Sequence, residues 1–171
     1  MAPQRYYNWG SRLDKPGHFG GALLLFFAIL YLLPRGTDTL QTLVISLAAA
    51  GIAAAMSLKP DTDKKVLWGV FHRSWITHSL TTVIIATAGT YLLLSSVLKA
   101  GPLSFYVALA VFSATLSHVL LDSLTKSGVP LLGPLDNTMM GLRWFRSSNI
   151  LLNYFFLAAG TLMMLYYYGI I

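Results

Sequence analysis

The chain has 171 residues, of which 56% are hydrophobic and only 11% are charged, and its mean hydropathy is +0.64. Soluble domains carry about 25% charged residues, so this composition excludes an ordinary soluble enzyme and indicates a single membrane domain. The net charge of +6 invites a nucleic-acid partner, but the distribution of the basic residues gives that charge another origin.

Five apolar stretches follow one another along the chain, at residues 17–33, 40–58, 75–98, 103–124 and 150–171. A membrane-spanning helix needs roughly 17–25 apolar residues. None of the stretches shows the period-two alternation of a transmembrane β-strand. The sequence therefore predicts an all-α integral membrane bundle of five transmembrane helices.

The connection at residues 127–148 is unusual for a loop, because it combines three glycines and two prolines with bulky apolar residues. It is too short and too interrupted to span the bilayer. We expect it to lie in the membrane interface or to re-enter it. There it would either cover a site or anchor the protein through Trp144 and Phe145.

The basic residues are distributed asymmetrically. Ten of the twelve lie before the first stretch, between the second and third, or between the fourth and fifth; the other two are Arg35 and Lys99. These three regions share one side of the membrane, which the positive-inside rule makes cytoplasmic. We therefore predict an inner membrane protein with a cytoplasmic N-terminus, an external C-terminus and no nucleic-acid partner.

The histidines and several aspartates gather at the same predicted face: His18, Asp61, Asp63, His72, His78, His118 and Asp122. His118 and Asp122 are four residues apart, so they share one face of a helix. That spacing suits two ligands of one cation, or one ligand and the group that orients it. His72 lies six residues before His78, so if both bind metal it must come from the loop before the helix.

Nitrogen and oxygen ligands without sulfur suit zinc, manganese, iron or nickel. Seven such groups exceed the four ligands of one tetrahedral zinc, so we predict a divalent metal site, zinc in the first place, with two or more ions. Each residue also has a simpler explanation. A lone histidine at an interface is often solvated, Asp61 and Asp63 could cap a loop helix, and Arg73 could anchor the topology. Ionisable residues inside a span are costly and mark function, which favours the metal site.

Three ordered motifs resemble one known family: "PDTD" at 60–63, "HRSWITHS" at 72–79 and "SHVLLDSLTKSGVPLLGP" at 117–134, preceded by "GHFGG" at 17–21. They resemble the LexA-regulated, membrane-bound metal-dependent hydrolases, the YdjM-like proteins. The matching positions are His18, Asp61, Asp63, His72, Arg73, Thr77, His78, His118, Asp122, Thr125 and Gly128. One departure is visible, since Ser74 replaces a glycine and the two histidines of the middle motif are one residue further apart.

The resemblance implies a hydrolase that is distantly similar to zinc phospholipase C and P1-type nucleases. On that basis the seven histidines and aspartates are the expected metal ligands, and Thr77 and Thr125 are expected to support them. Asp61 or Asp63 would bridge metals or orient the nucleophile, and Arg73 would grip a phosphate or stabilise an oxyanion. The expected substrate is a membrane lipid or a lipid-linked phosphoester.

Two other functions stay open at this point, a metal-ion transporter and a non-catalytic metal-binding membrane protein. A transport path needs polar residues near the midplane and the outer end, whereas the outer halves of 75–98 and 103–124 are almost entirely apolar. A structural site would saturate its ligands, whereas a catalytic site keeps a water position. Haem suits the sequence less, because aspartates beside the histidines do not favour axial ligation.

Overall fold

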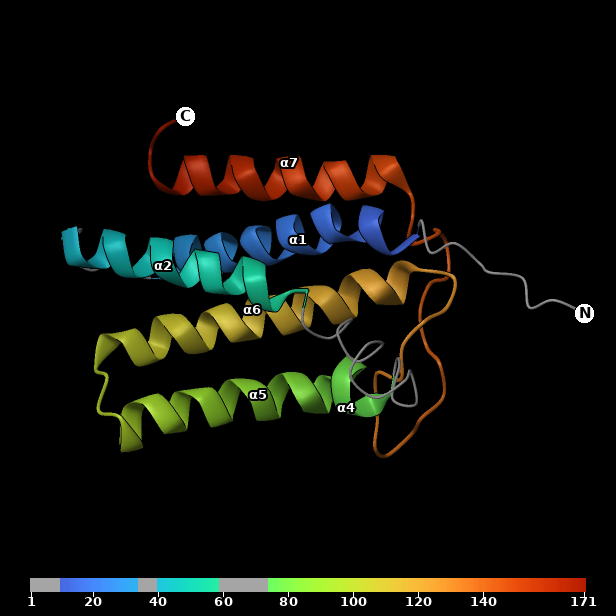
Figure 1. Ribbon diagram of the computed structural model, residues 1–171, viewed down its shortest axis with the longest axis horizontal. Helices are drawn as coiled ribbons and strands as arrows, with labels where there is room; N and C mark the ends of the chain where they lie inside the picture. The colour runs from blue at the N-terminus through green and yellow to red at the C-terminus, as the bar shows by residue number, and fades with distance from the viewer. Residues whose placement is uncertain (1–9, 34–39, 59–73) are drawn as a thin grey trace, which may run out of the picture.

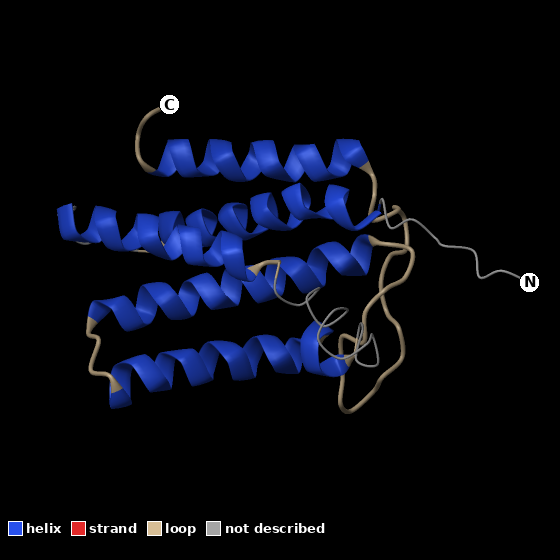
Figure 2. Cartoon of the chain, in the orientation of Figure 1, coloured by secondary structure: helices blue, strands red, loops and turns tan. Residues whose placement is uncertain are grey.

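The computed structural model describes residues 10–33, 40–58 and 74–171, with only the backbone for residues 10–14. The described residues form a helical bundle (Figure 1), and extended pairing among them is limited to two isolated bridges (Figure 2). The prediction of an all-α membrane bundle is confirmed. Its elements are α1 Gly10–Leu32, α2 Leu40–Met56, α4 Trp75–His78, α5 Leu80–Leu92, the π-helix η2 Leu93–Val97, α6 Pro102–Leu124 and α7 Ile150–Tyr167.

Four segments of the described chain are long and apolar enough to cross a membrane: Lys15–Leu32, Leu80–Val97, Pro102–Leu124 and Ile150–Tyr167. They correspond to four of the five predicted spans. The fifth, α2, has 17 residues, is shorter than the other four, and packs against α1 and α6. The spans Leu80–Val97 and Ile150–Tyr167 bury few of their residues, as expected for helices that face lipid.

The helices approach closely because small residues lie between them. Ala49, Ala50 and Ala53 of α2 are buried against α1 and α6. Where α1 meets α7, a Cβ atom built on Gly160 would lie 2.2 Å from the carbonyl oxygen of Gly20, so only glycine fits. This is the usual way in which membrane helices gain close packing. The close packing places α1 between α7 and α6 (Figure 1).

The predicted continuous helix over 75–98 is wrong, because the helix breaks at Ser79. The backbone of Ser79 is extended, and its hydroxyl accepts the Thr82 backbone N–H at 3.2 Å, which caps α5. The Thr82 hydroxyl donates back to the carbonyl oxygens of Trp75 and Ile76 at 2.8 and 2.9 Å. Local side-chain bonds of this kind compete with the helical ladder. As a result α4 is a separate turn that directs His78 into the bundle.

The connection between α6 and α7 folds over one end of the bundle (Figure 1). Bridges pair Thr125 with Phe145 and Val129 with Met140, and Val129 is fully buried. The Leu80 N–H also donates to the Leu131 carbonyl at 3.0 Å, which ties the connection to the start of α5. Its position relative to a bilayer stays a prediction.

Candidate metal centre

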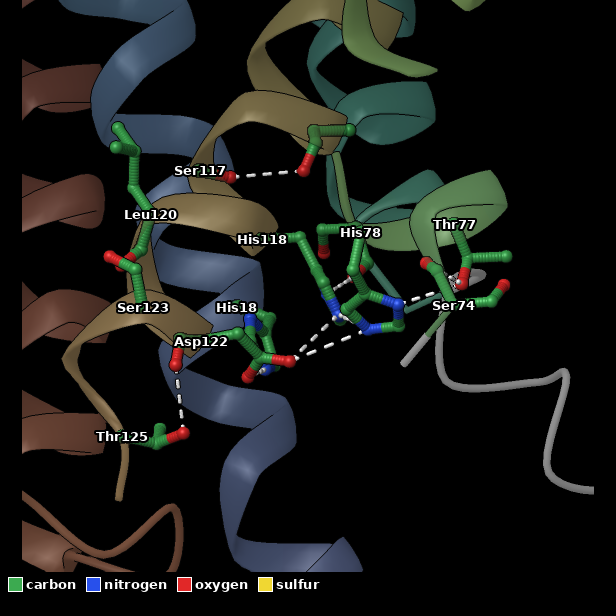
Figure 3. A network of polar contacts seen from close by, with 12 residues as sticks. His18, Ser74, Thr77, His78, Ser117, His118, Leu120, Asp122, Ser123 and Thr125 are labelled. Carbon is green, nitrogen blue, oxygen red and sulfur yellow. Dashed lines mark hydrogen bonds and ion pairs between the residues drawn. The ribbon is translucent and has the colours of Figure 1, made fainter. Parts of the chain in front are cut away.

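Three histidines and one aspartate meet at the end of the bundle that the α6–α7 connection covers. His18 comes from α1, His78 from the single turn α4, and His118 and Asp122 from the last two turns of α6 (Figure 3). His78 and His118 are fully buried, and His18 and Asp122 are 5% and 3% exposed. Four ionisable side chains are thus shielded together inside an apolar bundle, where each would be costly alone.

The carboxylate of Asp122 lies within reach of all three imidazoles. Its Oδ2 atom is 3.4 Å from His78 Nε2 and 3.7 Å from His118 Nε2, and its Oδ1 atom is 3.7 Å from His18 Nε2. The two Nε2 atoms of His78 and His118 are 3.3 Å apart, and the His18 ring stacks on the His118 ring at 4.0 Å. The side-by-side placement of His118 and Asp122 on one helix face is as the spacing predicts.

Two of the imidazoles are held by their other nitrogen. His118 Nδ1 lies 2.7 Å from the carbonyl oxygen of Ser57, which can only accept, so Nδ1 carries the proton. His78 Nδ1 lies 2.7 Å from Thr77 Oγ1, and that hydroxyl donates to the Ser74 carbonyl at 3.4 Å. With the hydroxyl turned to Ser74, the threonine oxygen accepts from His78 Nδ1–H. In these tautomers both histidines have a lone pair on Nε2, the arrangement that metal-binding histidines show.

This geometry fits a divalent cation. In these tautomers two lone pairs face each other across 3.3 Å, and a cation between them would relieve their repulsion. With bonds of about 2.0–2.1 Å, two ligands of a tetrahedral zinc lie roughly 3.3–3.4 Å apart. The His78–His118 and His78–Asp122 separations of 3.3 and 3.4 Å match that value. His18, His118 and Asp122 also each offer one ligand atom, and these three atoms lie within 4.8 Å of one another.

The comparison with known families agrees with the motifs and the fold. Residues 13–170 match the model of the YdjM inner membrane protein family. The chain belongs to this family. It is accordingly an inner membrane protein, and its apolar helices agree with that location. No curated protein and no solved structure matches the chain, and the distant similarity to zinc phospholipase C and P1-type nucleases stays a prediction.

The other predicted site residues of this YdjM-family protein fall into two groups. Asp61, Asp63, His72 and Arg73 lie outside the described residues. Thr77 lies beside His78 as described above, and Thr125 ends α6, where its hydroxyl donates to the backbone carbonyl of Asp122 at 2.8 Å. The ligand roles that the sequence predicts for His18, His78, His118 and Asp122 stay predictions, now with a geometry that suits them.

A small pocket opens beside the cluster. It is lined by His18, Asp122, Thr125, Arg146 and Asn153, among others, and has a volume of about 20 Å³. That is room for about one water molecule. The exposed Arg146 therefore lines the same space as the carboxylate.

Two contributors to the site were missed from the sequence. The Ser57 carbonyl orients His118, and no sequence signal marks it because every residue carries a carbonyl. Asn153 of α7 lines the pocket, and its amide donates to the carbonyls of Ser147 and Asn149, each at 2.9 Å. A lone asparagine within an apolar span was a usable signal, because amides inside membrane helices mark helix contacts.

Proposed function

We propose that this YdjM-family protein is a membrane-embedded, metal-dependent hydrolase that cleaves a phosphoester of a lipid or lipid-linked substrate at the cytoplasmic membrane face. One observation carries the proposal. Three imidazoles and a carboxylate, all buried, approach within 3.3–3.7 Å at the end of a bundle of membrane-spanning helices. A pocket of about 20 Å³ beside them leaves space for a water molecule, which a purely structural site would not need.

Zinc is the proposed metal, with two or more ions. His18, His118 and Asp122 offer ligand atoms within 4.8 Å of one another, and the separations of His78 Nε2 from His118 Nε2 and Asp122 Oδ2, 3.3 and 3.4 Å, match neighbouring ligands of a tetrahedral zinc. Asp61, Asp63 and His72 would then supply ligands for a further ion. A bound divalent cation lowers the pKa of water and polarises the oxygen of the phosphoester under attack.

The protein's own groups would hold and orient the reactants. The Ser57 carbonyl and the Thr77 hydroxyl fix the imidazole rings of His118 and His78, so their Nε2 lone pairs point into the cluster. Arg146 lines the pocket and would bind a phosphate oxygen, a role for which its guanidinium is suited. We assign Arg73 to the developing negative charge, and Asp61 or Asp63 to orienting the nucleophile.

The basic residues support the proposed orientation in the membrane. The α6–α7 connection covers the end of the bundle where the cluster lies, and it carries Lys126, Arg143 and Arg146 (Figure 1). Lys99 lies at the opposite end, between η2 and α6. By the positive-inside rule the cluster faces the cytoplasm. The same connection exposes Leu135 and Trp144, at 95% and 67%, which suits contact with the membrane interface.

Metal transport is less well supported. A transport path needs ionisable or polar groups through the whole bilayer. Among the described residues, the buried ionisable side chains are all in the cluster, and farther along α6 the buried polar groups are the hydroxyls of Ser104, Ser113 and Ser117. Nothing in the described part of the chain extends the histidines toward the other end.

The test combines metal content with catalysis. The full chain is purified in mild detergent, and zinc is measured by elemental analysis in the wild type, His118→Ala and Asp122→Asn. Ser113→Ala is the matched control, because Ser113 is buried on the same helix but outside the cluster. Zinc-loaded protein is then reconstituted with phosphatidylglycerol or phosphatidic acid, and released headgroup or phosphate is measured.

We expect bound zinc and product release in the wild type and the control. Both cluster variants should lose the zinc and should release no product. A wild type without stoichiometric metal would overturn the metal site. Stoichiometric metal with no release from any phospholipid tested would overturn the hydrolase and leave a non-catalytic metal-binding protein.

A further inference from the structure

An apolar groove of about 430 Å³ runs along the outside of α1, α6 and α7. Its lining includes Leu24 and Ala28 of α1, Leu120 and Leu124 of α6, and Phe156 of α7. Leu120 is 48% exposed, so the groove opens to the surface of the bundle and not into a closed interior. The volume falls within the usual range of ligand pockets, about 300–1,000 Å³, which are likewise lined mainly by apolar side chains.

The groove exists because small residues lie at its floor. Gly21 of α1 and Ser117 of α6 both line it. A Cβ atom on Gly21 would lie 2.8 Å from the Leu121 side chain and 3.5 Å from Ser117 Cβ. Larger residues at these positions would fill the space between the two helices. Because the residues at these positions are small, the groove stays open along the face that the membrane would cover.

The groove shares lining residues with the polar pocket beside the metal centre. Leu121 and Phe156 line both, and the pocket also contains His18, Asp122 and Arg146. A single molecule could therefore place its apolar tail in the groove and its anionic head at the mouth of this small pocket. Arg146 supplies the positive charge that an anionic head needs, and the groove supplies only carbon and small hydroxyl surfaces to the tail.

The length of the groove matches one leaflet. From His18 beside the pocket to Ala28 at the far part of the groove, α1 advances ten residues, or about 15 Å. The hydrocarbon core of a bilayer is about 30 Å thick. A chain that starts at the membrane face and follows α1 would thus reach about the midplane, as one chain of a phospholipid does.

We infer that this groove holds one hydrocarbon chain of an anionic phospholipid whose phosphate lies at Arg146 and the histidine–aspartate cluster. That this lipid is the substrate rests on the proposed hydrolase function. The substrate class is then a phosphoester that carries a long hydrocarbon chain and is taken directly from the cytoplasmic leaflet. A water-soluble phosphoester of the same headgroup would lack the contacts that the groove provides.

The test is photo-crosslinking of the zinc-loaded full chain in lipid nanodiscs. The probe is phosphatidylglycerol with a diazirine in the middle of one acyl chain, and labelled peptides are mapped by mass spectrometry. We expect saturable labelling at residues 24–28 and 120–124, competed by unlabelled phosphatidylglycerol but not by chain-free glycerophosphoglycerol. Labelling spread evenly over the lipid-facing sides of α5 and α7, or labelling that does not saturate, would overturn the inference. This readout needs no variant.

Ala28→Phe tests the groove directly, because it adds a ring to the groove wall away from the cluster. Ala48→Phe is the matched control, because Ala48 is exposed on α2, which does not line the groove. We expect Ala28→Phe to reduce the groove labelling roughly tenfold through steric exclusion, and Ala48→Phe to leave it unchanged. Zinc content should match the wild type in both. Unchanged labelling in a folded, zinc-loaded Ala28→Phe would overturn the inference.

Lipid hydrolysis is measured on the same samples, so that the two proposals fail separately. Groove labelling without product supports the lipid site and overturns the hydrolase. Product release together with labelling spread evenly over the lipid-facing helices supports the hydrolase and overturns the groove as the lipid site. Arg146→Gln should weaken the saturable labelling without changing its position, and a variant with wild-type affinity would overturn the assignment of the phosphate to Arg146.

Discussion

The hydroxyl of Thr77 is predicted to act on metal binding only through His78. Thr77→Val removes the oxygen that lies 2.7 Å from His78 Nδ1 and keeps the shape of the side chain. The fully buried imidazole then loses its acceptor and its fixed orientation. Loss of a hydrogen-bond partner behind a metal-binding histidine costs about 10–100-fold in metal affinity, or roughly 1.4–2.7 kcal/mol.

The assay is zinc affinity of the detergent-purified protein, measured by competition with a fluorescent zinc chelator. Thr161→Val is the matched control. Its hydroxyl donates to the Leu157 carbonyl within α7 at 2.9 Å, away from the cluster. We expect wild-type affinity in the control and a 10–100-fold loss in Thr77→Val, the range stated above.

A double-mutant cycle separates positioning from general destabilisation. If Thr77 acts through His78, then Thr77→Val should change zinc affinity little once His78→Ala is present. An equal loss in both backgrounds would refute the reasoning. So would an unchanged affinity in the single Thr77→Val variant.

Two further predictions concern the packing that positions the site. Gly160→Ala should lower the free energy of unfolding by about 1–3 kcal/mol in a denaturing-detergent titration, because its Cβ would lie 2.2 Å from the Gly20 carbonyl oxygen. Gly51→Ala, with nothing within 4 Å of its Cβ, should be neutral or slightly stabilising, and equal stability of the two variants would contradict the close α1–α7 contact. Ser79→Ala should cost about 0.5–2 kcal/mol in the same titration through loss of the α5 cap, and an alanine variant as stable as the wild type would show that the cap does not stabilise the break.

The membrane class and most of the helices could be predicted from the sequence, because both depend on local properties. A run of apolar residues must satisfy its backbone within itself in lipid, so its length predicts a helix. The break at Ser79 could not be predicted in this way. It depends on the hydroxyls of Ser79 and Thr82 and on a backbone bond from Leu80 to Leu131, which lies far along the chain.

For the candidate site, the sequence by itself determined the types of ligand group and the one-turn spacing of His118 and Asp122, because helix geometry relates residues four apart. Only the tertiary structure decided that His18 stacks on His118 and that the Ser57 carbonyl orients that ring. It also decided that the pocket at Arg146 shares lining residues with an apolar groove. These relations join atoms from separate helices, and several involve backbone groups or empty space, neither of which any single residue type encodes.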